Sequence, residues 1–482
     1  MFNIIMEISK YLILIMMAIY TFECFSVFGY HDAYTKMWIL RRQSIWIFLI
    51  HFLAFLTMFL SMKEVKLLGF YVIQVAILGA IILFYNVLYP KVSRLVVNNM
   101  CMLLSVGFIM LTRLDYDNAV KQVMIVAGSA VCSLLVPVII RKVKFLSRLR
   151  MFYAVVGVVA LVAVIIAGQK AYGAMLGFTV AGITIQPSEL VKIVFVFFVA
   201  ASFYKCTSFK NVVITTAVAA LHVLILVASK DLGAALIIFV VYLVMLYVAT
   251  RKPLYIAAGM GAGALASVAG YFLFAHVRNR VTAWKDPFAD YNGVGFQVAQ
   301  SLFAIGTGGW FGLGLCQGMP DKIPVVTTDF IFSAISEELG GIFAICIILI
   351  CVSCYIMFLN IAMQLRDSFY KLVALGLGTC YIFQVFLAIG GVSKFIPSTG
   401  VTIPFVSYGG SSLLSAMIMF AIIQGLYILR EDEEDDIERQ KERQLRAKRR
   451  RAQTGRPGSN GTRTPKRTAQ GNGRRKPENR RS

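Results

Sequence analysis

The sequence predicts an all-α polytopic membrane protein. Of its 482 residues, 59% are hydrophobic and only 15% are charged, whereas soluble domains carry roughly 25% charged residues. The mean hydropathy is +0.75. Apolar runs recur along most of the chain, and each is about 18 to 22 residues long, which is enough to cross a bilayer as a helix. A membrane β-barrel would instead show short segments of alternating polarity.

Thirteen such runs predict about thirteen transmembrane helices. The runs are far longer than the roughly ten residues with which a strand crosses a membrane, so helices are expected throughout. In chain order, the expected helices lie near residues 9–29, 44–62, 67–88, 96–112, 120–140, 151–168, 187–204, 211–228, 232–249, 254–275, 330–358, 370–390 and 408–429.

Positive charge alternates between the two ends of these helices. Every odd-numbered connection contains Lys or Arg, and the fifth, RKVKFLSRLR at Arg141–Arg150, is the most basic. Loops rich in Lys and Arg stay on the cytoplasmic side of a membrane. We therefore expect the N-terminus outside, the C-terminus in the cytoplasm and the long connection at 276–328 outside.

The chain ends in a charged tail. Residues 431–482 contain 17 Lys/Arg and nine Asp/Glu, and the whole chain has a formal net charge of +23. The first part, EDEEDDIERQKER, is expected to continue the last helix, and the Arg/Gly/Pro-rich remainder is expected to be disordered. This excess of positive charge indicates attraction to anionic membrane lipids and no nucleic-acid partner. The tail is suited either to tethering at the membrane surface or to docking of a partner protein.

Ionisable side chains at membrane depth are candidates for function, because each costs a few kcal/mol unless it is paired or solvated. The first such stretch is IQPSELVKI at Ile185–Ile193. Pro187 suits the first turn of a helix, and Glu189 favours the positive end of the helix dipole. Glu189 and Lys192 are three residues apart, so they share a face and can pair. The pair is either a structural device at a helix start or the polar wall of a cavity open to the outside.

The second stretch, SKDLGAAL at Ser229–Leu236, places Asp231 at the outer start of a helix. Two helices meet here with almost no connecting residues. Capping of the helix is the simplest role for Asp231.

The third stretch is the long outer connection, which begins HVRNR at 276–280. Arg278 and Arg280, with Lys285 nearby, are suited to binding a diphosphate. Residues 296–306, FQVAQSLFAIG, have the apolar spacing of an amphipathic helix. Eight glycines allow close approach of the backbone to itself or to a ligand; they are Gly293, Gly295, Gly306, Gly308, Gly309, Gly312, Gly314 and Gly318.

The fourth stretch, VSKFIPSTGVTIPFVSYGGSS at Val392–Ser412, brings Lys394 and a segment rich in Pro, Gly and Ser to the same outer side. A non-helical backbone at membrane depth must be buried in protein or line a wet cavity. We therefore expect this segment to form part of a site.

The stretch TTDFIFSAISEELG at Thr327–Gly340 joins the long outer connection to the eleventh run. Asp329 lies at the junction, where a carboxylate is either a helix N-cap or a reactive group. Glu337 and Glu338 follow two turns later and are expected to pair within the bundle.

Together these stretches resemble the SEDS family (shape, elongation, division and sporulation) of membrane peptidoglycan polymerases, which includes RodA, FtsW and SpoVE. Order and spacing match over about residues 96–430. Three family positions differ, since Gly177 stands where Trp is common, and Val325 and Thr327 stand where Glu and His are usual. The matching motifs are QPSEL at 186–190, DLG at 231–233, RNR at 278–280, DP at 286–287, GVGFQVAQSLFAIGTGGWFGLGL at 293–315, TDFIFSAISEELG at 328–340 and PSTGVTIPFVSYGGSS at 397–412.

The resemblance implies a domain organisation. Residues 1–95 would be three additional helices, 96–430 a ten-helix polymerase core with an extracellular loop at 276–329, and 431–482 a cytoplasmic tail. The expected location is the bacterial cytoplasmic membrane.

The resemblance also implies polymerisation of lipid II, with Asp329 as the catalytic carboxylate. The sugar hydroxyl of one lipid-linked disaccharide would attack the anomeric carbon of another with inversion, and a polyprenyl diphosphate would leave. A divalent cation such as Mg²⁺ or Mn²⁺ fits this chemistry, and a class B penicillin-binding protein is the implied transpeptidase partner. Substrate-binding roles are expected for Arg278, Arg280, Lys394, Glu189, Lys192, Asp231, Gln300 and Ser407.

Two other functions use the same features. A flippase for the lipid-linked precursor would also need polar groups at membrane depth, so Glu189, Lys192 and Asp231 do not discriminate between the two. A non-catalytic scaffold for a transpeptidase would need an interaction surface and would not depend on the carboxylate of Asp329.

Overall fold

The computed structural model describes residues 2–171, 174–180 and 183–454. Contacts divide the chain into two compact units, Met1–Glu431 and Asp432–Ser482. The first unit is a bundle of helices, which confirms the expected all-α polytopic membrane architecture.

Every apolar run of the sequence is helical in the structure. Within the described residues, eleven helices are long and apolar enough to cross a membrane, and the shorter α6 and α7 coincide with the two remaining runs. The helices are α1 (Phe2–Gly29), α2 (Ala33–Met62), α3 (Lys66–Leu88), α4 (Arg94–Leu114), α5 (Tyr116–Lys142), α6 (Arg150–Ala167), α7 (Pro187–Phe203), α8 (Phe209–Ala228), α9 (Leu232–Thr250), α10 (Pro253–Leu273), α14 (Gly341–Gln364), α15 (Ser368–Val392) and α16 (Gly410–Thr454).

The run expected as one helix at 330–358 is broken in the structure, which corrects the prediction. A short helix, α13 (Ile331–Leu339), ends at Gly340, and α14 begins at the next residue. Gly340 has a φ of 90°, and a β-carbon there would lie 2.4 Å from the backbone nitrogen of Gly312. Only glycine fits this conformation and this contact. The apolar pattern continues across the break, so hydrophobicity alone did not reveal it.

The connections between α10 and α13 and between α6 and α7 contain regular structure. The expected amphipathic helix is confirmed as α12 (Phe296–Gly308), and it is preceded by α11 (Ala275–Lys285) and followed by a 3₁₀ turn, η2 (Pro320–Lys322). Between α6 and α7 lies a small antiparallel sheet, which was not predicted. Its strands pair in the order β1 (Gln169–Ala171), β2 (Ala174–Val180) and β3 (Ile183–Ile185).

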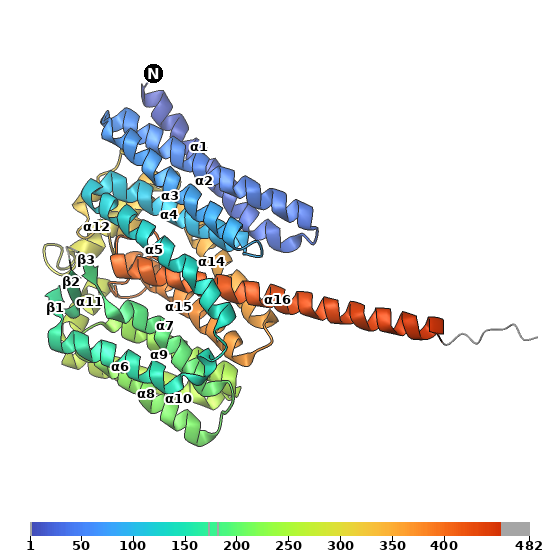
Figure 1. The fold of residues 1–482 in the computed structure, drawn as a ribbon. Coiled ribbons are helices and arrows are strands. Elements are labelled where there is room, and N and C mark those ends of the chain that lie inside the picture. The colour runs from blue at the N-terminus through green and yellow to red at the C-terminus, as the bar shows by residue number, and fades with distance from the viewer. Residues whose placement is uncertain (1, 172–173, 181–182, 455–482) are drawn as a thin grey trace, which may run out of the picture. The chain divides into compact units, whose positions relative to one another are not determined.

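Helix α4 lies at the centre of one half of the bundle. All eighteen residues of its apolar window are buried, because α2, α3, α5 and α14 pack around it and α1 packs against α2 and α14. Figure 1 shows α1, α2 and α3 together along one side of the bundle, beside α4 and α5.

A row of polar side chains fixes α4 to these neighbours. Asn98, Ser105 and Thr112 are spaced by seven residues and therefore share one face of the helix. The Asn98 amide donates a hydrogen bond to the Leu40 carbonyl (2.8 Å). Ser105 bonds to the imidazole of His51 (2.9 Å), and the Gln74 amide donates to Thr112 (3.2 Å). Hydrogen bonds between helices are worth about 0.6 to 2 kcal/mol each in a bilayer, so this row specifies the position of α2 and α3.

Candidate active site

A buried ion pair lies at the start of α7. Lys192 Nζ is 2.9 Å from Glu189 Oε2, and the lysine side chain is only 1% exposed. Pro187 opens the helix, as predicted, and Glu189 stands in its first turn. An ammonium group this deep is stable only when it is paired and hydrogen-bonded.

Gln384 of α15 completes the environment of Lys192. Its side-chain oxygen accepts a hydrogen bond from Lys192 Nζ (2.7 Å), and its amide nitrogen donates to the Thr402 carbonyl (3.1 Å). The Thr402 and Ser412 hydroxyls bond to each other (2.8 Å). We call Glu189, Lys192, Gln384, Thr402 and Ser412 the buried network; it joins α7, α15 and the start of α16.

Asp231 is the N-cap of α9, as the capping interpretation expects. Its Oδ1 accepts from the Ala234 backbone N–H (3.1 Å). Its Oδ2 accepts from the Ser188 hydroxyl (2.8 Å) and the Gln186 amide (3.1 Å). The carboxylate therefore ties the start of α9 to the start of α7.

The non-helical segment 396–409, which we call the strap, connects α15 to α16. Its backbone is anchored at three places by side chains or loops from elsewhere. Gln122 of α5 donates to the Ser407 carbonyl (3.2 Å), Gln384 donates to the Thr402 carbonyl, and the Tyr408 N–H donates to the Thr327 carbonyl (2.8 Å). The last bond joins the strap directly to the turn that contains Asp329.

Asp329 and Arg280 meet at the strap. A β-carbon on Gly400 would lie 3.4 Å from Arg280 Nη2 and 3.5 Å from Asp329 Oδ2. Gly400 has a φ of 72°, a backbone conformation that favours glycine, whereas a β-carbon at these distances would make only ordinary contacts. Arg280 also donates from Nη1 to the Ser398 carbonyl (3.0 Å), which fixes the guanidinium on the strap.

The electrostatics of Asp329 follow from its surroundings. Burial raises the pKa of this carboxyl group above its ordinary value, while the positive charge of Arg280 acts in the opposite direction. Burial also lowers the pKa of Arg280, although the negative charges of Asp329 and Asp231 act to raise it. Asp329 is not a helix cap, because α13 has Phe330 at its N-cap position and no side-chain capping bond. Among the described residues, no hydrogen bond to the Asp329 carboxylate is found.

The two arginines of the RNR motif separate. Arg280 faces the strap, whereas Arg278 is exposed and donates to the Phe272 carbonyl at the end of α10 (2.7 Å). The predicted pair of converging arginines is therefore not formed in this structure. Lys394 is half-buried at the start of the strap region, and its carbonyl accepts from the Trp284 indole (3.2 Å).

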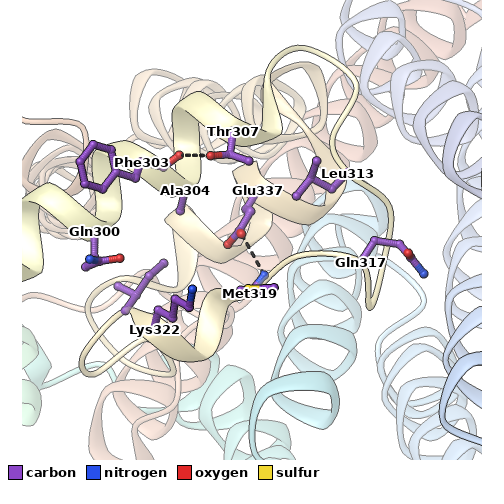
Figure 2. Close-up of a pocket in the computed structure, with 10 residues that line it drawn as sticks. Gln300, Phe303, Ala304, Thr307, Leu313, Gln317, Met319, Lys322 and Glu337 are labelled. Atoms are coloured by element: carbon purple, nitrogen blue, oxygen red, sulfur yellow. Dashed lines mark hydrogen bonds between the residues drawn. The ribbon is translucent and has the colours of Figure 1, made fainter.

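Gln300 and Ser407 lie apart from Asp329. Ser407 is buried and accepts from the Ile403 backbone N–H (3.0 Å), so its hydroxyl stabilises the turn of the strap. Gln300 donates to the Tyr291 hydroxyl (2.7 Å) and lines a separate pocket between α12 and η2. Figure 2 shows this pocket, with Glu337 reaching across it toward the backbone nitrogen of Met319.

The acidic pair at the end of α13 has structural partners. Glu338 is fully buried, and its Oε1 lies 3.1 Å from Arg113 Nε of α4. Burial raises the pKa of Glu338 to about 7, although the charge of Arg113 opposes the shift. Glu337 accepts from the Met319 N–H (2.9 Å). These contacts agree with the expected role of both residues within the bundle.

Sequence reasoning missed Gln384, Gln122 and Gly400. The two glutamines were detectable in principle, since an amide in an apolar run needs partners for the same reason as a charge does. Gly400 was visible only as one glycine of a flexible-looking segment. As for a metal, the described residues contain no group of three His, Cys, Asp or Glu side chains that is placed to bind one.

A family comparison matches residues 88–431 to the model for the FtsW, RodA and SpoVE cell cycle proteins. The peptidoglycan glycosyltransferase RodA of Mycobacterium tuberculosis strain H37Rv is 40% identical over 267 residues, which are 52% of this chain and 57% of that protein. The RodA of Mycobacterium leprae is 32% identical over 360 residues, 69% of this chain and 77% of that protein. The chain thus spans little more than half the length of the first of these relatives.

Two solved structures share the fold. One, described as structural coordination of polymerization and crosslinking by a peptidoglycan synthase complex, superposes with a TM-score of 0.60 at 21% identity, and covers 70% of this chain and 98% of its own. The rod shape determining protein RodA of Thermus thermophilus gives a TM-score of 0.53 at 20% identity, with 70% and 97% covered. At this level of identity the likeness concerns the fold alone.

Proposed function

Since the chain belongs to the FtsW, RodA and SpoVE family of cell cycle proteins, we propose that it is a peptidoglycan glycosyltransferase that polymerises lipid II into glycan strands. The observation that supports this most directly is the meeting of one carboxylate and one guanidinium, Asp329 and Arg280, at Gly400.

The reaction needs two kinds of group. The sugar hydroxyl of one lipid-linked disaccharide must lose a proton as it attacks the anomeric carbon of another. The bond from that carbon to the diphosphate breaks, and negative charge develops on the departing polyprenyl diphosphate. A base and a fixed positive charge within one small site supply both requirements.

Asp329 is the base in this proposal. Its carboxylate has no hydrogen-bond donor among the described residues, so it is available to a substrate hydroxyl. The upward direction of its pKa increases its affinity for a proton, which improves base catalysis as long as the group remains ionised at the working pH.

Arg280 has two roles. Its charge keeps the pKa of Asp329 from rising further, and its guanidinium faces the same space, where it stabilises the leaving diphosphate. Lys394, half-buried on the same outer segment, adds positive charge. The buried network and Asp231 position the strap and the helix starts that carry this site.

The orientation in the membrane is part of the proposal. The N-terminus would lie outside and the C-terminus in the cytoplasm, since the basic connections alternate with the outer ones. Asp329 would then face the outer leaflet, where the lipid-linked substrate is polymerised. A class B penicillin-binding protein is the proposed partner, in keeping with the peptidoglycan synthase complex whose fold is similar.

The test is polymerisation of lipid II by the purified chain. Asp329→Asn removes the base and keeps the shape, so the rate should fall by about 10²- to 10⁴-fold. The matched control is Asp321→Asn, an exposed aspartate on the same loop, which should retain wild-type activity. Polymer formed by Asp329→Asn at the wild-type rate would refute the proposal.

The purified chain, reconstituted in liposomes, also discriminates the glycosyltransferase from the two alternative functions, a flippase and a non-catalytic scaffold. A flippase would move labelled lipid II across the bilayer, and wild type would form no polymer. A scaffold would show neither activity, and cells that carry Asp329→Asn would grow normally.

A further inference from the structure

The outer ends of α1 and α2 contact the glycine-rich part of the large loop. We call residues 309–318 the glycine loop. The rings of Tyr11 in α1 and Phe311 in the glycine loop are 6.0 Å apart. A β-carbon on Gly314 would lie 3.9 Å from Lys10 Cδ. At the end of α2, Ser61 lies beside the thiol of Cys316. Both helices therefore touch the same ten residues.

The glycine loop is in turn bonded to the helix that follows Asp329. The N–H groups of Leu313 and Gly314 donate to the carbonyls of Glu337 and Glu338 (2.9 Å each), and the Gly341 N–H donates to the Gly309 carbonyl (2.8 Å). A β-carbon on Gly312 would lie 2.4 Å from the Glu338 carbonyl oxygen. Contact this close leaves the loop and the end of α13 little freedom to move independently.

Helix α13 connects this contact to the active site. All nine of its residues are buried, and it begins two residues after Asp329. A buried helix of nine residues, about 13 Å long, moves as a unit. A displacement of the glycine loop at one end of α13 is therefore transmitted to Asp329 at the other.

The helices that make this contact lie outside the part of the chain shared with relatives. The family model matches residues 88–431, whereas α1, α2 and almost all of α3 precede residue 88. The solved relatives are covered almost completely by 70% of this chain. The contact between α1, α2 and the glycine loop is thus a feature added to the shared core.

We propose that α1–α3 form a built-in positioning unit for the active site, in which the outer ends of α1 and α2 fix the glycine loop against α13 and thereby set the position of Asp329. This inference rests on the proposed function for its catalytic consequence. The contact itself is independent of that function.

The first test is a double-mutant cycle in the full-length chain. Tyr11→Ala and Phe311→Ala should each lower kcat for lipid II polymerisation by about threefold to tenfold, the range for loss of one aromatic contact, with KM and the melting temperature little changed. The double variant should be no slower than the slower single variant, because both remove the same contact. Tyr11→Phe keeps the ring and should keep the rate.

Phe22→Ala is the matched control. Phe22 lies on the same helix with 73% of its surface exposed, so its removal should leave kcat unchanged. Full activity in Tyr11→Ala and Phe311→Ala would overturn the proposal. The proposal would also be overturned if the loss of kcat in the double variant equalled the sum, in free energy, of the losses in Tyr11→Ala and Phe311→Ala.

The second test does not require enzymatic activity. Cys316 is a half-buried residue of the glycine loop, so its reaction with a membrane-impermeant maleimide reports whether the glycine loop is in place. In a Cys132→Ser, Cys206→Ser background, which removes the two exposed thiols, Tyr11→Ala should label several times faster than the parent, and Phe22→Ala at the parent rate. Equal labelling in all three would overturn the positioning unit. If wild type labels as expected but forms no polymer, the proposed function fails while the contact stands.

Discussion

Two polar regions of the bundle contain an acidic and a basic residue near each other, and they differ in how fully these residues are bonded. In the buried network, Glu189 and Lys192 are 2.9 Å apart and Gln384 occupies a further donor position of the lysine. At the strap, Asp329 and Arg280 face each other across Gly400, and the carboxylate has no hydrogen bond from a described residue.

This difference indicates that the buried network has a structural role and that the Asp329 site has a reactive one. A buried charge with all its partners in place is stable and unreactive. A half-buried carboxylate with an elevated pKa and one nearby cation, such as Asp329, is typical of a functional group, because its remaining bonding capacity is left for a ligand. The spacing of Glu189 and Lys192 predicted the first pair, whereas the sequence did not show that Arg280 lies near Asp329.

The largest effect is expected in the buried network. Lys192→Met leaves Glu189 buried without its partner, which should destabilise the fold by about 3–5 kcal/mol. Thermal unfolding in detergent and the yield of folded protein measure this loss. The double variant Glu189→Gln, Lys192→Met removes both charges and should recover most of the stability. A single variant as stable as wild type would show that the network is not structural.

At the strap, Arg280→Gln should act on the reaction and its pH dependence. Loss of the charge that stabilises the leaving group should lower kcat by about 10²-fold. Arg280 lowers the pKa of Asp329, so its removal raises that pKa further. A base must be ionised, and the acid limb of the kcat–pH profile should therefore move to higher pH. Arg278→Gln, at the exposed arginine two residues earlier, should leave the profile where it is.

A smaller effect is expected at Gly400. An alanine there adopts an unfavourable positive φ, which costs roughly 1–2 kcal/mol, at a position whose β-carbon would lie beside both Arg280 and Asp329. We expect polymerisation about tenfold slower with normal lipid II binding. Gly409→Ala on the same strap is the control, since Gly409 does not have a positive φ and its β-carbon would also meet only ordinary contacts, at 3.6 and 4.0 Å. Equal rates for the two variants would mean that the backbone conformation at Gly400 does not matter to the site.

The helices and the amphipathic helix of the long loop could be predicted because hydrophobic length and periodicity can be read directly along the chain. The choice between Arg278 and Arg280 could not, because residues two apart lie on different sides of a helix and the sequence does not show which side meets the strap. The break at Gly340 also escaped prediction, since it depends on contact with a loop some thirty residues earlier. The assignment of catalysis to Asp329 remains a prediction that the geometry supports.

The row of polar side chains on α4 has a consequence for synthesis of the protein. A helix with Asn98, Ser105 and Thr112 on one face is unfavourable alone in hydrocarbon, because those groups would lack partners. Their partners on α2 and α3 precede them in the chain and enter the bilayer first. When α4 enters the bilayer, the hydrogen-bond partners of its three polar side chains are therefore already present. Membrane insertion then requires no intermediate in which these side chains are exposed to lipid.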